Sequence, residues 1–554
     1  MTPIACLLTT DGVPRYAHKT GLPFAMFPGS VAGLPPDMAT MPQLLRQAGY
    51  SAHMVGKWHI GHAQRAQTPV GRGFESHVGS FMWDLESYTK MMWRGPGWAV
   101  GRDWGRHYEN GSSEHWAEPR HATLAITQEA EDRMREHRED QGDKPLFLYV
   151  SYNAAHSPLQ PEPDWEAECG HIPHLWRREF CAMVVGLDKA IASLADTARS
   201  VLGENTVIVV SPDNGGSTWF GGNNEPLRGA KLTPFEGGVR VPAFMLDFSR
   251  QYSSVPATGS MDRMVHVTDW LPTFLSWAGA SQLTKDLGLD GLDQTQALLT
   301  GQLVRREMVL EMYTKEDSHD GTESVAYRNG RFKIVQGHFR DPHWYSEPVS
   351  DMVATSDDDS WMPRLLELIV RIAEWIFGNG PTDIMPHGML LNVILFNHHI
   401  KRQGGVKTWL FDLEKDPNEM NDLVQSKAHH KILRSMVLTL QEIKYGRPVP
   451  THQYWYVHPN WEEDGFVPGD CSMQPVGLLE NCKFAHPWLE DDADLFDLEG
   501  LGLENNMDAT KKILLLYATA SVGIILMLVL TACKIFGKII FSSQTNGSNK
   551  RKKE

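Results

Sequence analysis

The stretch from Thr206 to Pro242 constrains the fold more than any other part of the sequence. It opens with an unbroken apolar run, Val207–Val210, which is typical of a strand buried on both faces of a parallel sheet. A Ser-Pro pair ends the run, and Asp213 and Asn214 follow at once. Polar groups just beyond the carboxyl end of a buried strand are where open α/β sheets bind ligands. This stretch therefore predicts a binding site at a sheet edge.

Asp213 and Asn214 have two interpretations. A carboxylate beside an amide oxygen is a hard oxygen pair suited to Ca²⁺ or Mg²⁺. The same residues precede Gly215, and Asn-Gly is also a common turn dipeptide. The metal interpretation is favoured because the arrangement of a strand followed by a polar cluster occurs twice more upstream.

The two upstream strands have the same design. Tyr50–Val55 is a predicted strand, and Lys57 and His59 follow it closely enough to face one anion. Leu146–Ser151 is a second apolar strand, and His156 lies in the loop after it. A helix predicted over 177–198 leads into the strand at 207, so strands and helices alternate. This alternation predicts an α/β fold with a mainly parallel sheet.

Composition limits the class of protein. The chain has 554 residues, which predicts a large domain plus a second unit. A net charge of −16 argues against nucleic acid as a partner. Six cysteines are too few for a disulfide framework in a chain of this length. Cys181 lies in an apolar helical pattern and is predicted to be a buried thiol, whereas Cys471 and Cys482 are close enough in sequence to pair in a secreted chain.

The pattern changes in the second half of the chain. We predict a large α/β domain over 1–330 and a small antiparallel sheet with one packing helix over 331–460. The latter contains an insert, 351–400, with an apolar amphipathic helix. The insert either packs on the sheet or forms a surface that touches a membrane or covers the site. Residues 461–512 are acidic and rich in Trp and Pro, as in a juxtamembrane linker.

A membrane anchor is predicted near the C-terminus. Ile513 to Cys533 is uncharged and long enough to cross a bilayer as a helix. The basic tail 534–554 follows it, so the positive-inside rule places this tail in the cytosol. The body of the protein is then lumenal or extracellular, in the lysosome, the secretory pathway or at the cell surface. On that side, Asn110 begins an Asn-Gly-Ser glycosylation acceptor.

Several motifs resemble the sulfatase family, in particular its arylsulfatase B-like (N-acetylgalactosamine-4-sulfatase-like) branch. They are SPDNGG, PLRGAK and EGGVRVP in the 206–242 stretch, and GYSAHMVGKWHIG over 49–61. The resemblance implies an alkaline-phosphatase-like α/β fold with helices on both faces of the sheet. It also implies a calcium ion and a formylglycine nucleophile made from cysteine. By the same resemblance, His59 and His156 are catalytic, Lys57 and Lys231 bind the substrate, and Asp213 and Asn214 bind the metal.

The N-terminus departs from the family pattern. The segment LLTTDGVPRYAHKTGL over 7–22 resembles the part that follows the family's C-x-P-S-R motif. Met1 stands at the position of the cysteine, while Pro3 is retained and Cys6 lacks the motif. There is also no charged start followed by an apolar core, as a signal peptide requires. We therefore expect a chain truncated at its N-terminus, without the first strand of the sheet and without the metal ligands on that strand.

The expected function is hydrolysis of sulfate esters on glycans or aryl compounds. The lysines and a divalent cation would neutralise charge growing on the sulfate oxygens, and a histidine would protonate the leaving alcohol. Without the nucleophile, the chain as written is expected to be inactive and weakly stable. One alternative is a membrane-displayed relative that binds sulfated glycans without turnover. Another is a phosphoesterase of the same superfamily, which the GKWH cluster disfavours.

Overall fold

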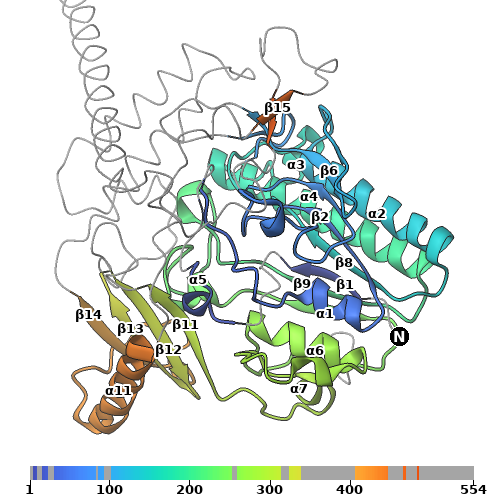
Figure 1. The fold of residues 1–554 in the computed structure, drawn as a ribbon. Coiled ribbons are helices and arrows are strands. Elements are labelled where there is room, and N and C mark those ends of the chain that lie inside the picture. Colours follow the sequence, from blue (N-terminus) through green and yellow to red (C-terminus); the bar gives the residue numbers. More distant parts are fainter. Residues whose placement is uncertain are drawn as a thin grey trace, which may run out of the picture. The chain divides into compact units, whose positions relative to one another are not determined.

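The computed structural model (Figure 1) describes residues 4–8, 15–22, 26, 30–82, 85–92, 101–252, 259–313, 323–338, 406–446, 466–468 and 483–485. All of them belong to one compact unit, formed by Met1–Trp93 and Val100–Asp492. Outside the described residues lie the predicted insert 351–400, the membrane segment 513–533 and the tail 534–554. Within the described ranges, no helix combines the length and apolar character needed to cross a bilayer.

The main sheet has eight strands, and the five at its centre run parallel. The three outer strands are antiparallel to their neighbours, so the sheet is mixed. The order from edge to edge is β10 (Phe244–Asp247), β9 (Val207–Ser211), β1 (Ile4–Leu8), β8 (Leu146–Ser151), β2 (Ser51–Gly56), β3 (Ser76–Gly79), β6 (Gly105–Tyr108) and β7 (Ser113–Glu114).

The position of β1 differs from the sequence prediction. We expected a sheet without its first strand, yet Ile4–Leu8 lies between β8 and β9 and pairs in parallel with both. The register places Ile4 opposite Phe147 on one side and Val207 on the other. The run Ile-Ala-Cys-Leu-Leu is apolar throughout, as a strand between two parallel neighbours must be. The centre of the sheet is therefore continuous, because β1 fills the position between β8 and β9.

Both faces of the main sheet are covered by helices. Leu146, Leu148 and Val150 alternate along β8 and pack in one core cluster with α2 and α4, whereas Phe147 and Tyr149 contact Phe74. Figure 1 shows α2 and α4 on one face and α1, α6 and α7 on the other. The bounds are α1 (Met41–Gln47), α2 (Ala122–Gln141), α3 (Pro163–Glu168), α4 (Leu175–Val201), α5 (Glu236–Val239), α6 (Trp270–Trp277) and α7 (Thr295–Thr300).

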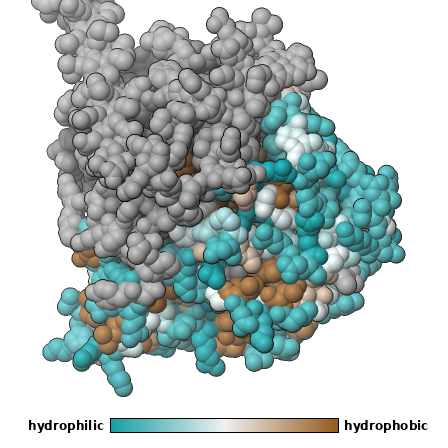
Figure 2. Space-filling view, viewed as in Figure 1, coloured by the Kyte–Doolittle hydropathy of each residue, from teal (hydrophilic) through white to brown (hydrophobic). Residues whose placement is uncertain are grey.

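The outer surface of α2 is hydrophilic, as its charged sequence predicts. On this surface Arg135 pairs with Asp132 at 2.9 Å, and Gln128 also donates to Asp132 at 2.9 Å. Figure 2 shows the corresponding hydrophilic surface on the right of the molecule, where α2 lies in Figure 1. Such exposed pairs contribute little stability individually, so α2 is held mainly by its buried face.

A second, antiparallel sheet follows the main one, with the strand order β11-β12-β13-β14. Its elements are β11 (Glu307–Tyr313), β12 (Ser324–Asn329), β13 (Phe332–Gly337), β14 (Lys407–Asp412) and the packing helix α11 (His430–Gly446). The sheet and its helix are as predicted, but the boundary is not. A boundary between residues 330 and 331 falls inside the β12–β13 hairpin, where Asn329 pairs with Phe332. The small sheet begins at Glu307, and both sheets belong to the same compact unit.

Two short strands lie in the region predicted to be a linker, 461–512. They are β15 (Phe466–Pro468) and β16 (Lys483–Ala485), which pair with each other. β16 also pairs with β5 (Gly101–Arg102), which pairs in turn with β4 (Met91–Met92). These strands are therefore folded parts of the compact unit. The pair Cys471 and Cys482 lies outside the described residues.

The prediction of a buried thiol at Cys181 is wrong. Cys181 on α4 forms a disulfide with Cys169, which caps the C-terminus of α3, and the two Cα atoms are 6.1 Å apart. Cys169 is buried and packs with Trp165 and Ala182. The helical spacing of Cys181 indicates core packing, but it does not reveal that the neighbouring helix α3 brings a second cysteine to the same apolar cluster.

Removing this disulfide should destabilise the protein without changing the fold. Crosslinking residues 12 apart in the sequence constrains the unfolded chain, and loops of about 15 residues correspond to about 3 kcal/mol. The double variant Cys169→Ser, Cys181→Ser should therefore unfold at a clearly lower temperature in a calorimetric scan. Dithiothreitol should lower the midpoint of the wild type and leave that of the variant unchanged. An equal response of both proteins to the reductant would contradict the crosslink.

Candidate active site

The predicted site residues meet at the carboxyl edge of the main sheet. Lys57 and His59 follow β2, His156 follows β8, and Asp213 follows β9. Because these strands are parallel, their carboxyl ends open on one edge. The Lys57 Nζ atom lies 3.8 Å from Asp213 Oδ2, although β8 and β1 separate their two strands. The structure thus brings together side chains that are more than 150 residues apart.

Lys231 reaches the same place from the loop between β9 and α5. Its backbone N–H donates to the carbonyl of Gly216 at 3.3 Å. Its ammonium group interacts electrostatically with both Asp213 and Lys57. Burial lowers the pKa of Lys231, the Asp213 carboxylate opposes this, and the positive charge of Lys57 adds to it. Two ammonium groups therefore share one carboxylate, which leaves the site with excess positive charge.

A close backbone contact sets the direction of Lys57. Gly56 has φ of 106°, and a Cβ atom there would lie 1.9 Å from the carbonyl oxygen of Ser151. Only glycine fits, because both the conformation and the space exclude a side chain. The N–H of Lys57 then donates to that same carbonyl at 2.9 Å. The ends of β2 and β8 are thereby fixed to each other just before the predicted site residues Lys57 and His59.

The two predicted catalytic histidines lie partly buried beside these cations. Burial lowers the pKa of His59 well below its ordinary value, and the charge of Lys57 lowers it further. Burial lowers the pKa of His156 to about 3, helped by the charges of Lys231 and Lys57. His59 Nε2 lies 3.0 Å from the carbonyl of Met26, and His156 Nδ1 lies 2.7 Å from that of Ser157. Both rings are therefore oriented by backbone carbonyls and are neutral in the free protein.

The loop after Asp213 is held in place by direct contacts between backbone atoms. Gly215 donates its N–H to the carbonyl of Gly238 at 2.9 Å, and a Cβ atom at Gly215 would lie 1.8 Å from the carbonyl oxygen of Gly237. Asn214 donates from Nδ2 to the carbonyl of Gly215 at 2.9 Å. The backbone at the end of β9 is thus pressed directly against α5.

Sequence reasoning missed two residues that position this site. Asp103 is buried and accepts the N–H groups of Phe81 and Met82 at 2.8 and 2.6 Å, and the carbonyl of Phe81 accepts the N–H of His59. Burial raises the pKa of Asp103 to about 6, although these two hydrogen bonds oppose the shift. Nothing in the sequence around Asp103 signals this role, because its partners are backbone groups about 20 residues away.

Asn224 is the second such residue. Its Oδ1 accepts the N–H of Gly216 at 2.8 Å, and its Nδ2 donates to the carbonyls of Gly216 and Gly229 at 2.9 and 3.2 Å. It therefore ties the Asp213 loop to the loop that carries Lys231. The motif GGNNEPLRGAK contains two adjacent asparagines, and their sequence alone does not distinguish the bridging one from its neighbour.

The described residues do not form a complete calcium site. Asp213 and Asn214 offer a carboxylate and an amide oxygen, which are suitable donors, but Ca²⁺ takes six to eight oxygens. Among the described residues, no group of three or more His, Cys, Asp or Glu side chains could hold a metal ion. Asp213 instead pairs with the Lys57 ammonium group, whose Nζ lies 3.8 Å from Oδ2.

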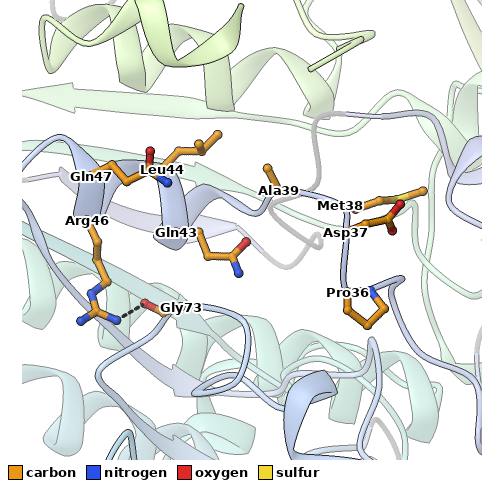
Figure 3. Close-up of a pocket in the computed structure, with 9 residues that line it drawn as sticks. All are labelled: Pro36, Asp37, Met38, Ala39, Gln43, Leu44, Arg46, Gln47 and Gly73. Carbon is orange, nitrogen blue, oxygen red and sulfur yellow. Dashed lines mark hydrogen bonds between the residues drawn. The ribbon is translucent and has the colours of Figure 1, made fainter. Parts of the chain in front are cut away.

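A surface pocket of about 610 Å³ lies beside α1 and is separate from this site (Figure 3). Arg46 in this pocket donates to the carbonyl of Gly73 at 3.4 Å and forms ion pairs with Glu75 and Glu109. Its charge is therefore satisfied within the protein. None of the predicted site residues lines the pocket, whose lining is Pro36, Asp37, Met38, Ala39, Gln43, Leu44, Arg46, Gln47 and Gly73.

Comparison with known proteins finds relatives that are named as sulfatases. Mouse arylsulfatase J is 31% identical over 436 residues, which cover 77% of this chain and 66% of that protein, just under two thirds of its length. Pig N-acetylgalactosamine-6-sulfatase is 30% identical over 469 residues, covering 82% of this chain and 78% of that protein. These relatives do not identify the arylsulfatase B-like branch, which stays a prediction.

The fold has a solved counterpart. The crystal structure of Ps i-CgsB in complex with k-i-k-neocarrahexaose matches with a TM-score of 0.60 and 20% identity, covering 83% of this chain and 97% of that one. At that identity the likeness concerns the fold alone. The sequence profile of the family described as Sulfatase matches residues 5–280. With the pig relative matched over more than two thirds of its length, these findings show that the chain belongs to the sulfatase family.

Proposed function

We propose that this chain is a sulfuric ester hydrolase of the arylsulfatase type that acts on sulfated glycans or aryl sulfates. The observation that carries the proposal is the meeting of Lys57, Lys231, His59 and His156 beside Asp213. Two cations and two neutral histidines in a partly buried site suit a compact anion with an alcohol leaving group. The names of the relatives, arylsulfatase J and N-acetylgalactosamine-6-sulfatase, support this substrate class.

The chemistry follows from where charge develops. Hydrolysis forms a new S–O bond to an oxygen that comes from water and breaks the S–O bond to the alcohol, so negative charge develops on the sulfate oxygens and on the leaving oxygen. Lys57 and Lys231 stabilise the first, and a histidine neutralises the second by giving a proton. His156 Nδ1 is held by the Ser157 carbonyl, which makes Nε2 the basic nitrogen of the neutral ring. A bound anion raises the pKa of that nitrogen because it offsets the lysine charges that lower it.

A calcium ion and a formylglycine belong to the same proposal. The ion would be held in part by Asp213 and Asn214, and would supply further positive charge beside the sulfate. The formylglycine requires a cysteine within C-x-P-S-R, and the printed sequence contains no such motif. Met1 stands at the matching position. We therefore expect no turnover of a chromogenic aryl sulfate by the chain as printed, and measurable turnover would contradict this expectation.

The two lysines beside Asp213 also suit an alternative function that needs no chemical step. A pseudo-sulfatase displayed at a membrane would use Lys57 and Lys231 to bind sulfated glycans without hydrolysing them. The two functions share the binding step and differ in the chemical step. A direct binding measurement therefore tests what they have in common, and comparison of aryl sulfate with a matched aryl phosphate tests the phosphoesterase alternative.

The cellular placement is also a proposal. We place the body of the protein in an oxidising compartment or outside the cell, with residues 513–533 as a membrane helix. The disulfide between Cys169 and Cys181 supports this, because such bonds persist mainly in secreted and lumenal proteins. Asn110 lies exposed in the hairpin between β6 and β7, where a glycan has room. Its modification stays a prediction.

Removing one site cation should weaken anion binding. Lys231→Met deletes a partly buried ammonium group, and a hydrogen bond to a charged group contributes about 1.5–3 kcal/mol. We therefore expect the dissociation constant for inorganic sulfate, measured by isothermal titration calorimetry, to rise at least about tenfold. The matched control is Lys189→Met, an exposed lysine on α4 that pairs with Glu168. Equal affinities in the two variants would contradict a role for Lys231 in binding.

Sulfate affinity should rise as the pH falls. In the free protein the pKa of His156 is about 3, and a bound anion raises it, so the complex takes up a proton that the free protein lacks. Between pH 7 and pH 5 the affinity should therefore increase, by up to about tenfold per pH unit for one proton. Inorganic sulfate is the suitable probe because it does not itself titrate in this range.

The variant His156→Gln should flatten this pH dependence, because the amide cannot take up the proton. His171→Gln is the matched control, since His171 is exposed in the connection between α3 and α4. The control should keep the wild-type slope. A slope that persists in His156→Gln would show that another group carries the linked proton.

A further inference from the structure

A buried cluster of three charges lies between the two sheets. Lys333 on β13 donates from Nζ to Glu236 Oε1 at 2.8 Å, and the same Nζ lies 2.8 Å from Glu419 Oε1. None of the three side chains is more than 3% exposed. Glu236 begins α5, which Figure 1 shows between the main sheet and the small sheet. Glu419 belongs to the turn after β14, so three distant parts of the chain meet here.

Glu419 also closes the start of α5. Its second oxygen, Oε2, accepts the N–H of Glu236 at 2.7 Å. The residue before the helix, Phe235, provides no side-chain cap of its own. The backbone carbonyl of Glu419 accepts from Arg228 Nη1 at 2.9 Å, and this guanidinium lies 4.2 Å from the centre of the Phe235 ring. A four-residue helix that is too short to be stable alone is thus held by a residue from the C-terminal sheet region.

The charges of the cluster depend on one another. Burial by itself would raise the pKa of Glu236, but the charge and hydrogen bond of Lys333 hold it below the ordinary value. Burial raises the pKa of Glu419, Lys333 opposes this, and the charge of Glu236 adds to it. Removing a single member therefore changes how strongly the others hold α5, without altering any group in the active site.

α5 is in direct backbone contact with both loops of the active site, the one after Asp213 and the one that carries Lys231. Gly238 accepts the N–H of Gly215, two residues after Asp213. Gly237 donates its N–H to the carbonyl of Arg228 at 2.6 Å, at the start of the loop that carries Lys231. A Cβ atom at Gly237 would lie 2.4 Å from the carbonyl of Gly229, and one at Gly238 would lie 2.1 Å from that of Thr233. These contacts leave no room for adjustment, so a displaced α5 must displace the loops.

We propose that Glu419 and Lys333 are positioning residues of the active site. They hold α5 in the position that brings Asp213 and Lys231 close to Lys57. The inference rests on the proposed function, because it concerns the anion-binding geometry of that same site. It assigns to the C-terminal sheet a part in ligand binding, although no residue of that sheet is among the site residues. The described contacts run from Lys333 through Glu236 and α5 to Gly215 and Arg228.

The test compares Glu419→Gln with the wild type. Glutamine keeps the size of the side chain and an oxygen that can accept the N–H of Glu236, but it removes the charge that pairs with Lys333. We expect the dissociation constant for inorganic sulfate to rise about tenfold at a temperature well below unfolding. The matched control is Lys444→Met, which breaks the ion pair with Glu323 between α11 and the small sheet without reaching α5. This control should bind sulfate as the wild type does.

A second measurement follows Lys231 directly. Acylation of lysines by a soluble ester reagent, read by mass spectrometry, reports how accessible and how basic each ammonium group is. In Glu419→Gln, Lys231 should be acylated faster than in the wild type, whereas exposed Lys189 should keep its rate. A role in stability alone would lower the unfolding temperature of the variant and leave this ratio unchanged. Lys333→Met should show the same change in ratio if it folds, but the inference can be judged on Glu419→Gln alone.

The outcomes separate the two proposals. If the wild type binds sulfate, Lys231→Met loses binding and Glu419→Gln keeps both wild-type affinity and the wild-type acylation ratio, the positioning role is overturned and the proposed function stands. If the wild type does not bind sulfate or a sulfated ligand, the proposed function fails and the inference fails with it.

Discussion

The contact between Lys57 and Asp213 depends on the width of the parallel sheet. Their strands, β2 and β9, are three strand spacings apart, or about 14 Å. A lysine side chain spans less than half of that distance, so the two loops must both turn inward over the ends of β8 and β1. Gly56 allows this turn after β2, and Gly215 allows it after β9. The 3.8 Å contact is thus a product of four parallel strands and two glycines.

The close spacing of charged groups in the site determines which of them are protonated. Lys57 and Lys231 lie near one carboxylate, and the lowered pKa values of the two partly buried histidines beside them keep both rings neutral. Without a bound ligand, the site therefore carries more positive than negative charge. An anion that enters relieves repulsion between groups already held in place, and so it need not pull them together. This arrangement favours binding of small oxyanions over neutral ligands of the same size.

Local patterns in the sequence predicted the strands and the residues at their ends. Leu146–Ser151 and Val207–Val210 are apolar runs followed by turn residues, so both their extent and the polar cluster after them can be read directly. The strand Ile4–Leu8 was missed because a family comparison placed the chain's start after that strand. The Cys169–Cys181 bond was missed because helical periodicity describes one helix and not its neighbour. Contacts between distant segments cannot be predicted from local patterns, because the tertiary fold creates them. The contact between Glu419 and Glu236, which are 183 residues apart, is an example.

The choice of charged groups around α5 has a physical reason. Replacing a buried ion cluster by apolar side chains of similar volume is often neutral for stability or improves it, so stability alone does not explain Lys333, Glu236 and Glu419. Apolar contacts, however, are non-directional, whereas an ion pair with hydrogen bonds fixes distance and angle together. α5 needs such direction because its glycines have no side chains by which packing could set its position. The glycines of α5 permit its close approach to Gly215. The charged cluster of Lys333, Glu236 and Glu419 then fixes the position of α5 relative to Gly215.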